Sequence, residues 1–350
     1  MPIYALGSNG SGQLGLGHEE DVSEPRLVRV PETLTADRVR TVTAGGNHTL
    51  LLCTSGDVYA SGSNVNGRCG IIQERMQLST FEQVDLPGKV KLCAATWDAS
   101  IFALEDGRIM VCGAGAKGEL GLGRGHNQAT KPTDIAGFPP KGATVIDLAA
   151  CMGHVIIVLS NGDAYGWGTG RHGQIGEPAE DVWQPRKIEN VSFKVARAIC
   201  GKSFSCLLSD PTRGQVLLIG PSKRDLYNLK GSIPARVDPW IDTQASWGSV
   251  FMHMSSGQLL SWGRNDHGQL TPHNVPNVTS IAAGSEHMLA LTAAGQVLAW
   301  GWGEHGNCGS PLDGKSDVNG RWNTLEVNGQ VIRLGAGCAT SWIVVSDSKG

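Results

Sequence analysis

Two glycine-rich patterns in this sequence have spacings that can bind phosphate groups. G-x-G-x-x-G occurs at Gly113–Gly118, Gly168–Gly173 and Gly301–Gly306, and GSPLDGKS at 309–316 has the complete G-x-x-x-x-G-K-S spacing. Such glycines bind phosphate when they join a strand to a helix, because the N–H groups at the helix start point at the anion. The chemistry these patterns suggest is nucleotide binding.

The residues that follow these patterns do not favour a helix. EPAEDVWQPRKIEN, which follows Gly176, contains two prolines and no apolar repeat of helical period. In the 309–316 loop Pro311 removes one N–H group, and Asn319 and Gly320 stand where a helix would grow. We therefore interpret the glycines as turn residues and expect no cofactor.

His305 and Cys308 have the H-x-x-C spacing of half a zinc site, but their positions in a repeat suggest a simpler role. Cys308 and Cys69 stand where other repeats have leucine or isoleucine, so we expect core residues. His48, His154 and His287 recur at one strand position, which indicates structural residues that hydrogen-bond between neighbouring sheets. The sequence therefore predicts no metal site, no catalytic residue and no enzyme.

A strand that ends in glycine recurs along the whole chain. Six of its seven copies carry a second glycine five residues later, and the anchoring glycines are Gly7, Gly62, Gly113, Gly168, Gly220, Gly263 and Gly301. Six copies follow a short apolar run and a turn, which is a hairpin signal, and further short strands give four per repeat. The pattern predicts an all-β, seven-bladed β-propeller.

The two ends of the chain complement each other. The segment 331–350 supplies two blade strands and stops before the strand that ends in glycine, whereas the chain opens with that strand in PIYALG. We expect Ile3–Leu6 to pair with Ser341–Val345, so that N- and C-terminal strands share a blade and close the ring. Residues 1–350 are predicted to form a single domain.

Composition excludes several classes of function. Among 350 residues the formal net charge is −3, and Lys and Arg form no run, which argues against direct nucleic-acid binding. The nine cysteines contain no C-x-x-C, as expected of a reduced intracellular protein. MPIYALG lacks the features of a signal peptide and no long apolar run follows. We expect a protein without membrane segments, in the cytoplasm and also in the nucleus.

These repeats resemble those of the regulator of chromosome condensation family. The resemblance covers the whole chain, except that the fifth repeat has Arg224, Asp225 and Tyr227 in place of the second glycine and its flanks. The segments that carry it most clearly are Gly7–Gly17, Ala44–Thr49, Gly153–His154, Trp167–Gly176, Trp262–Leu270, Gly284–His287 and Trp300–Gly301. The resemblance implies a propeller that binds a partner protein.

Within the family, the opening YALGSNGSGQLGLGHEEDVSEP and the near absence of terminal extensions resemble the subfamily of fungal alpha-tubulin suppressors, or killer-toxin-insensitivity proteins. This resemblance implies a heterodimer with a small zinc-binding electron-carrier protein. The pair would support Elongator-dependent tRNA wobble-uridine modification and diphthamide synthesis, with indirect contact to the Elongator complex. The alternative is a guanine-nucleotide exchange factor for a Ran-type small GTPase. Trafficking or ubiquitin-ligase adaptors would bring further domains.

The loops after the anchoring glycines are the longest, so we expect the partner there. Trp167, Trp262 and Trp300 lie on the repeated strand and are predicted to be core. Tryptophans outside this pattern are candidate anchors, and nearby polar residues are candidates for the rim of the interface. The candidate partner-binding residues are Trp183, Trp240, Trp247, Trp302, Trp322, Arg171, His172, Arg264, Asp266 and His267.

Because the glycine patterns are interpreted as turns, we predict that the purified protein binds neither ATP nor NAD in the micromolar range. Isothermal titration calorimetry checks this directly. Micromolar binding that Lys315→Ala abolishes would show that the 309–316 loop holds phosphate after all.

Overall fold

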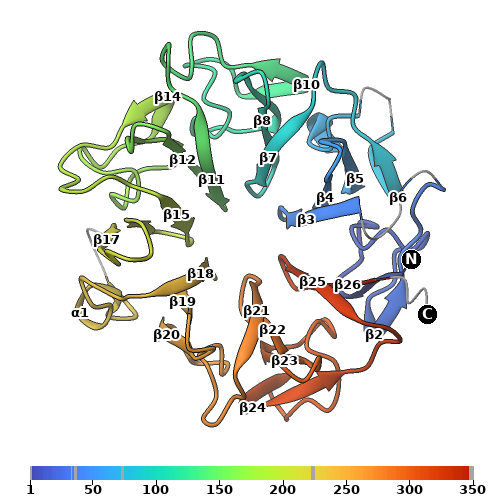
Figure 1. Cartoon of the computed structure of the whole chain (residues 1–350). Coiled ribbons are helices and arrows are strands. Elements are labelled where there is room, and N and C mark those ends of the chain that lie inside the picture. Colours follow the sequence, from blue (N-terminus) through green and yellow to red (C-terminus); the bar gives the residue numbers. More distant parts are fainter. Residues whose placement is uncertain (1, 33, 35–37, 72–74, 222–224, 347–350) are drawn as a thin grey trace. The chain divides into compact units, whose positions relative to one another are not determined.

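The computed structural model describes residues 2–32, 34, 38–71, 75–221 and 225–346. These residues form 26 strands in seven antiparallel sheets (Figure 1). The chain divides into two compact units, of which unit 1 comprises Met1–Ser63, Gln77–Val84 and Ile241–Gly350, and unit 2 comprises Asn64–Met76 and Asp85–Trp240. That residues 1–350 behave as a single domain stays a prediction.

Four of the sheets belong to unit 1. The first has the order β2-β1-β26-β25 and the second β3-β4-β5-β6, and these are followed by β18-β19-β20 and β21-β22-β23-β24. The strands are β1 (Ile3–Gly7), β2 (Val22–Leu27), β3 (Val39–Ala44), β4 (His48–Cys53), β5 (Val58–Ser63), β6 (Gln77–Gln83), β18 (Trp240–Ala245), β19 (Ser249–Met254), β20 (Leu259–Gly263), β21 (Val278–Ala283), β22 (His287–Thr292), β23 (Val297–Trp302), β24 (Asp317–Leu325), β25 (Val331–Ala336) and β26 (Thr340–Val345).

Unit 2 contains the other three sheets, in the orders β10-β9-β8-β7, β11-β12-β13-β14 and β15-β16-β17. Its elements are η2 (Val65–Gly67), β7 (Val90–Ala95), β8 (Ala99–Leu104), β9 (Ile109–Ala114), β10 (Gln128–Asp134), β11 (Val145–Cys151), β12 (His154–Leu159), β13 (Ala164–Gly168), β14 (Val182–Lys187), β15 (Arg197–Cys200), β16 (Ser205–Leu208), β17 (Val216–Ile219) and α1 (Leu229–Ser232).

The sheet shared by the two ends of the chain has the predicted register. Ile3 pairs with Val344 and Leu6 pairs with Ser341 in antiparallel β1 and β26. β2 lies on the other edge of β1 and β25 on the other edge of β26, so neither terminal strand is a sheet edge. The predicted sharing of one blade by N- and C-terminal strands is confirmed.

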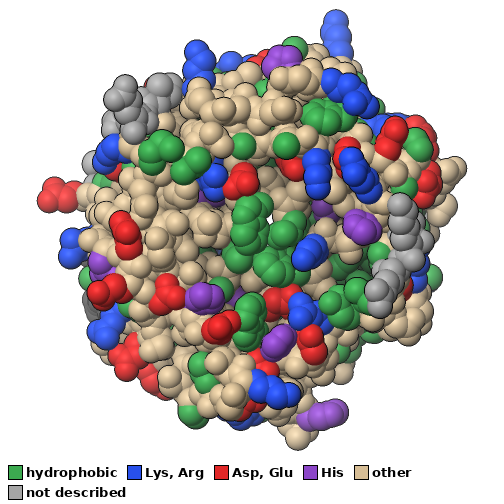
Figure 2. Space-filling model, turned by 180° about the vertical axis from the view of Figure 1, so that it is seen from behind, with side chains coloured by type: hydrophobic (Ala, Val, Ile, Leu, Met, Phe, Trp, Pro, Cys, Tyr) green, Lys and Arg blue, Asp and Glu red, His purple; other side chains and the backbone are tan. Residues whose placement is uncertain are grey.

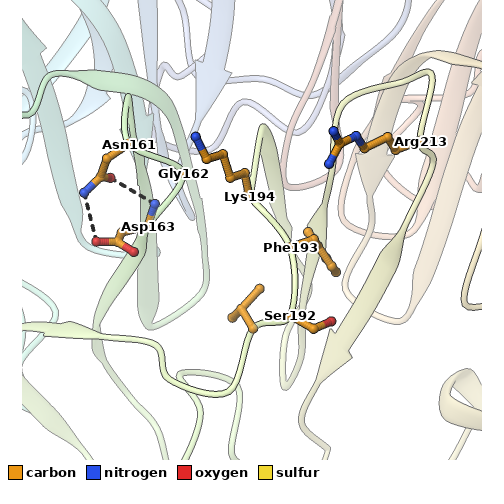
Figure 3. A pocket seen from close by; sticks show the side chains of 8 residues that line it. Asn161, Gly162, Asp163, Ser192, Phe193, Lys194 and Arg213 are labelled. Atoms are coloured by element: carbon orange, nitrogen blue, oxygen red, sulfur yellow. Dashed lines mark hydrogen bonds between the residues drawn. The ribbon is translucent and has the colours of Figure 1, made fainter.

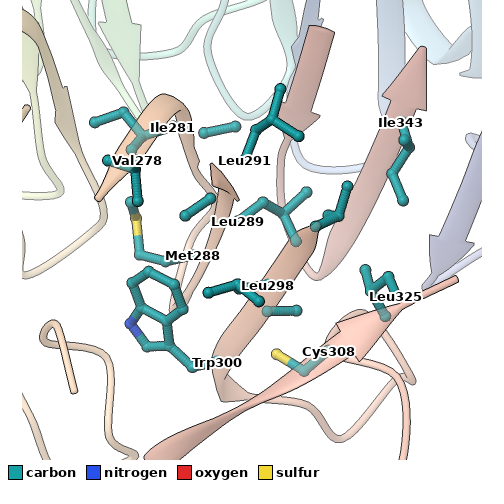
Figure 4. Packing of buried hydrophobic residues seen from close by; sticks show 14 of the residues in the cluster. Val278, Ile281, Met288, Leu289, Leu291, Leu298, Trp300, Cys308, Leu325 and Ile343 are labelled. Carbon is teal, nitrogen blue, oxygen red and sulfur yellow. The ribbon is translucent and has the colours of Figure 1, made fainter. Parts of the chain in front are cut away.

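The inner strands β12 and β22 are buried on both faces of their sheets. All six residues of β12, HVIIVL, are buried, and so are all six of β22, HMLALT. In unit 1 the side chains of Leu289, Leu298 and Trp300 form a cluster with Ile343 of the next sheet (Figure 4). Short β-branched and leucine-rich runs therefore serve here as fully buried strands rather than helices.

Two sheets have three strands where the repeat predicts four. In the β15–β17 sheet, the expected edge segment 234–239 makes only one isolated bridge, Gln215 to Arg236. In the β18–β20 sheet, residues 271–277 contain no strand. Both segments contain two prolines, which lack the N–H group that a strand needs for its ladder.

The glycine patterns are turns, as predicted. Gly168 and Gly301 have φ of +99° and +105°, and a Cβ on either would overlap the carbonyl oxygen of the turn beside it. No helix follows either glycine among the described residues, and the 309–316 segment runs directly into β24. Close approach of two backbones, not phosphate, explains the glycines.

Neighbouring sheets are joined by a recurring hydrogen bond to one loop carbonyl, which we call the latch. In each of these loops the acceptor is the residue just before the apolar residue that corresponds to Leu14 of the first repeat. In four loops hydroxyl groups donate: Thr49 and Ser61 to Gln13, Ser100 to Arg68, Ser205 to Gln174, and Ser341 to Asn307, at 2.6–3.0 Å. In two others an indole N–H donates, from Trp167 to Glu119 and from Trp300 to Gln269.

Two of the latches include a buried histidine, which confirms its predicted structural role. Nε2 of His154 lies 2.8 Å from Ser205 Oγ, and Nε2 of His287 lies 2.9 Å from Ser341 Oγ. Because each hydroxyl already donates its proton to the loop carbonyl, the histidine must donate from Nε2. Burial lowers the pKa of both rings from 6.5 to about 4, so they stay neutral near pH 7.

These histidines predict a loss of stability in mild acid. The folded-state pKa is about 4 and the unfolded value 6.5, so the unfolded chain binds protons first as the pH falls. Each neutral ring contributes its full stabilisation above pH 6.5. As the pH falls from 6.5 to 4 this contribution, on the order of 3 kcal/mol per ring, is lost. Denaturant unfolding at about pH 7 and about pH 5 measures the larger part of this loss, on the order of 2 kcal/mol per ring.

His154→Gln should reduce this pH dependence, whereas His126→Gln, at an exposed position, should leave it unchanged. Equal pH dependence in His154→Gln and the unmodified protein would contradict the assignment of the titrating groups.

Candidate functional site

The loop after β20 holds its polar side chains in a fixed geometry. Asn265 accepts a hydrogen bond from the Leu270 N–H at 3.0 Å, and Gln269 accepts one from the His267 N–H at 2.9 Å. The latch from Trp300 to the Gln269 carbonyl fixes the same loop to the next sheet. Arg264, Asp266 and His267, all predicted as rim residues, therefore project from a rigid support.

Arg264 connects two carboxylates. Nε and Nη2 of Arg264 donate to the Asp266 carboxylate at 2.6 and 2.9 Å, and Nη1 donates to Glu286. These bonds hold the pKa of Asp266 at about 2. The Glu286 side chain is only 3 % exposed, and burial raises its pKa although Gln269 and Arg264 both favour the charged form. One guanidinium thus balances an exposed and a buried carboxylate.

Trp302 lies beside this ion pair. The ring of His267 stacks on its indole, with centroids 5.4 Å apart and planes at 27°. His267 Nδ1 also lies 2.9 Å from the buried carboxylate of Asp317. Trp302 also makes a T-shaped contact with the ring of His305, whose Nδ1 is 2.8 Å from a carboxylate oxygen of Asp21. The half-buried indole is therefore surrounded by oriented polar groups.

We call Arg264, Asp266, His267, Glu286 and Trp302 the Trp302 cluster. It unites four of the predicted residues, three in the loop after β20 and one at the end of β23, with Glu286 from the turn between β21 and β22. Sequence reasoning missed Glu286, because a glutamate in a turn has the pattern of a solvated residue. The position of Glu286 did carry a signal, because it directly precedes His287, the residue that pairs with the anchoring glycine Gly301.

The other predicted residues of unit 1 lie at different depths. Trp247 is half-buried, and its backbone N–H donates to the carbonyl of Ser285, the residue before Glu286. It therefore borders the Trp302 cluster. Trp322 is half-buried on β24 and packs against the core of its sheet, as local packing would require.

A second group of predicted residues lies in unit 2, around Trp183. Arg124 stacks over the Trp183 ring at 5.5 Å, and Arg171 pairs with Asp181 at 2.8 Å. Arg124 and Trp183 line an open cavity of about 650 Å³. His172 is exposed and donates its backbone N–H to Gln174. We call this the Trp183 groove; sequence reasoning had not singled out Arg124.

Trp240 and Trp262 differ from their expected surroundings. Trp240 begins β18 and is only 7 % exposed, so it presents little surface to a partner. Trp262, predicted as core, is half-buried, whereas Trp167 and Trp300 are fully buried. The three core tryptophans have the same repeat position, so the difference lies in what covers them and not in their own sequence.

A further hollow of about 480 Å³ lies at the hairpin turns of unit 2 (Figure 3). Asn161, Asp163, Phe193, Lys194 and Arg213 line it. Asn161 donates to Asp163 at 2.9 Å, and Asp163 also pairs with Lys187, so its carboxylate is engaged within the protein. The site is polar and shallow, and it was recognised in the sequence only as a turn.

Two further properties of the described residues concern metal ions and membranes. Among them no three His, Cys, Asp or Glu side chains are placed to hold a metal ion. None of the described helices has the length and apolar character needed to cross a bilayer. On the face shown in Figure 2, Lys and Arg side chains are interspersed with Asp and Glu.

Residues 2–343 match the model of the RCC1-like domain. The chain belongs to this family. An RCC1 repeat-containing protein of Schizosaccharomyces pombe is 32 % identical to this RCC1-like chain over 99 % of both sequences. The mouse secretion-regulating guanine nucleotide exchange factor is 27 % identical, with 83 % of this chain and 72 % of that protein covered.

The RCC1-like fold is shown by a solved structure. Prp20p of Saccharomyces cerevisiae, described together with its binding to Gsp1p and histones, has a TM-score of 0.82 to this chain. The match covers 99 % of this chain and 92 % of Prp20p at 21 % identity, so it establishes the fold alone. The RCC1-like chain is a seven-bladed β-propeller, as the repeats predict.

The buried carboxylate of the Trp302 cluster makes Arg264 important for stability. Arg264→Met should lower the free energy of unfolding by about 3 kcal/mol, because Glu286 stays buried without its cation. Arg264→Met combined with Glu286→Met should recover part of the loss. Denaturant unfolding measures both.

Arg108→Met provides the comparison, since Arg108 and its partner Asp106 have 42 % and 48 % exposed side chains. Its effect should be much smaller than that of Arg264→Met, because water screens an exposed ion pair. Equal effects at the two arginines would contradict the importance of burial.

Proposed function

We propose that this RCC1-like propeller is a non-enzymatic scaffold that forms a heterodimer with a small zinc-binding electron-carrier protein. Through that partner it supports Elongator-dependent wobble-uridine modification of tRNA and diphthamide synthesis, with indirect contact to Elongator. It acts in the cytoplasm and also in the nucleus. The partner's identity is supported by the resemblance of the opening segment, YALGSNGSGQLGLGHEEDVSEP, to the killer-toxin-insensitivity proteins.

The Trp302 cluster is the observation that carries the scaffold function. Interface hot spots are enriched in tryptophan and arginine, in places where neighbouring groups exclude water. Trp302 is partly exposed, and its orientation is fixed by His267 and His305. Because the ring is already held in place, binding a partner costs little ordering entropy.

The charges around Trp302 set the kind of partner surface. The guanidinium of Arg264 pairs with the carboxylates of Asp266 and Glu286, and a third carboxylate, that of Asp317, pairs with His267. This excess of acid favours a partner patch with an apolar centre and basic residues at its edge. The Trp183 groove is the second candidate surface, since it also joins a tryptophan to an arginine.

Nucleotide exchange on a Ran-type GTPase is the second candidate function. The similarity to an exchange factor and the fold of Prp20p, whose published description concerns Gsp1p, favour it. An exchange factor would accelerate nucleotide release from the GTPase, whereas the scaffold would form a stable complex without doing so.

Trp302→Ala tests the proposed site. It should weaken association with the zinc-binding protein by on the order of 2 kcal/mol or more, about thirtyfold in Kd, while the melting temperature changes little. Calorimetry with the purified partner gives the affinity, and the same variant should impair wobble-uridine modification in cells. Trp183→Ala, a half-buried tryptophan of unit 2, is the matched control.

Other outcomes separate the alternatives. A loss of affinity in Trp183→Ala alone would move the site to the Trp183 groove. Gel filtration without any complex, together with GTPase exchange well above background, would replace the scaffold by the exchange factor.

A further inference from the structure

The β18–β20 sheet ends in a strand that has a neighbour on one side only. β20 pairs with β19, and its sheet contains no strand beyond it, whereas β23 of the next sheet is followed by β24 (Figure 1). Burial reflects this difference. The first five residues of β23 are buried, but in β20 only Leu259 is buried and the other four residues are partly exposed.

The pairing pattern shows which backbone groups of β20 face outward. Gln258 accepts from Met254 and Arg264 donates to Gly248, so alternate residues from 258 to 264 bond to β19. The outward residues are therefore Leu259, Ser261 and Gly263. In β23 the equivalent residues Val297, Ala299 and Gly301 pair with β24.

The chain that follows β20 adds no strand to this edge. Residues 271–277 connect β20 to β21 without forming a strand, and prolines stand at 272 and 276. The Thr271 N–H donates to the side-chain oxygen of Ser261, not to its backbone. A side chain in a strand points to a face of the sheet, so this bond places Thr271 over the face. Among the described residues no backbone hydrogen bond reaches the outward groups of Leu259, Ser261 and Gly263.

We propose that the outer edge of β20 binds an extended segment of a partner protein, which pairs with it as the missing fourth strand. Main-chain hydrogen bonds to Leu259 and Ser261 provide the register. Leu260 and Trp262, both partly exposed, provide apolar surface for alternate side chains of the segment.

Charge at one end of β20 sets a further property of the segment. The strand leads directly into Arg264, where the carboxylates of Asp266 and Glu286 share a single guanidinium. The segment therefore carries Lys or Arg at the end that lies against Gly263. This inference does not depend on the identity of the partner in the proposed function.

The chain itself supplies a suitable probe. A synthetic peptide with the sequence of β24, DVNGRWNTL, corresponds to the strand that occupies the equivalent edge of β23, and changing its first residue from Asp to Lys places the expected cation at the end that lies against Gly263. In the free protein, the amides of Leu259, Ser261 and Gly263 should exchange with solvent faster than those of Val297, Ala299 and Gly301. Addition of the peptide should slow exchange at the three β20 amides by at least about tenfold.

Two variants of Ser261 separate the backbone from the side chain. Ser261→Pro removes the outward N–H and the hydroxyl, and a proline is tolerated there because that N–H makes no bond to β19. Ser261→Ala removes the hydroxyl alone. Peptide binding by fluorescence should weaken about tenfold or more in Ser261→Pro and stay unchanged in Ser261→Ala.

Three results would overturn the proposal. The β20 amides could already be as protected in the free protein as those of β23, which would mean that the edge is closed. The peptide could leave their exchange unchanged or bind no better than a scrambled sequence. Gel filtration could show a dimer that Ser261→Pro dissociates, which would make a second copy of the chain the occupant.

Discussion

A single backbone acceptor in six of the loops constrains how the sheets of this protein pack. The loop carbonyl that follows each anchoring glycine is carried into the interior, where an unsatisfied acceptor costs about 1–3 kcal/mol. The next sheet supplies the donor, a hydroxyl at Ser341 or an indole N–H at Trp300. Because only the backbone oxygen takes part, the acceptor residue itself varies among Gln13, Arg68, Glu119 and Asn307.

The same constraint builds the candidate site. Arg264, Asp266 and His267 lie in the loop fixed through the carbonyl of Gln269, and Trp302 directly precedes the loop fixed through the carbonyl of Asn307. Between those fixed points the side chains are free to vary, so a repeated scaffold can hold an individual arrangement of Arg264, Glu286 and Trp302. Function in this fold resides in such loop residues, whereas the latch and the glycines maintain the geometry.

The sequence predicted the features that repeat and missed those that depend on what a neighbour covers. Gly168, His287 and the register of Ile3 follow from the period, because every copy faces the same steric and hydrogen-bonding demands. Trp240 and Trp302 are the same residue type outside the pattern, yet one is buried and the other stacks on His267. The two missing fourth strands had a signal in their prolines, but the repeat outweighed it. Glu286 was missed because its burial is matched by Arg264, a partner 22 positions away in the chain.

The sheet shared by the two termini has a consequence for synthesis of the chain. β1 leaves the ribosome long before its partner β26, which is not complete until Val345 has been added. At 5–20 residues per second this interval lasts roughly 20–70 s. During that time Ile3 and Leu6, both buried in the finished sheet, belong to a strand with an open edge. One edge of β1 therefore stays available for pairing with other chains until β26 is complete.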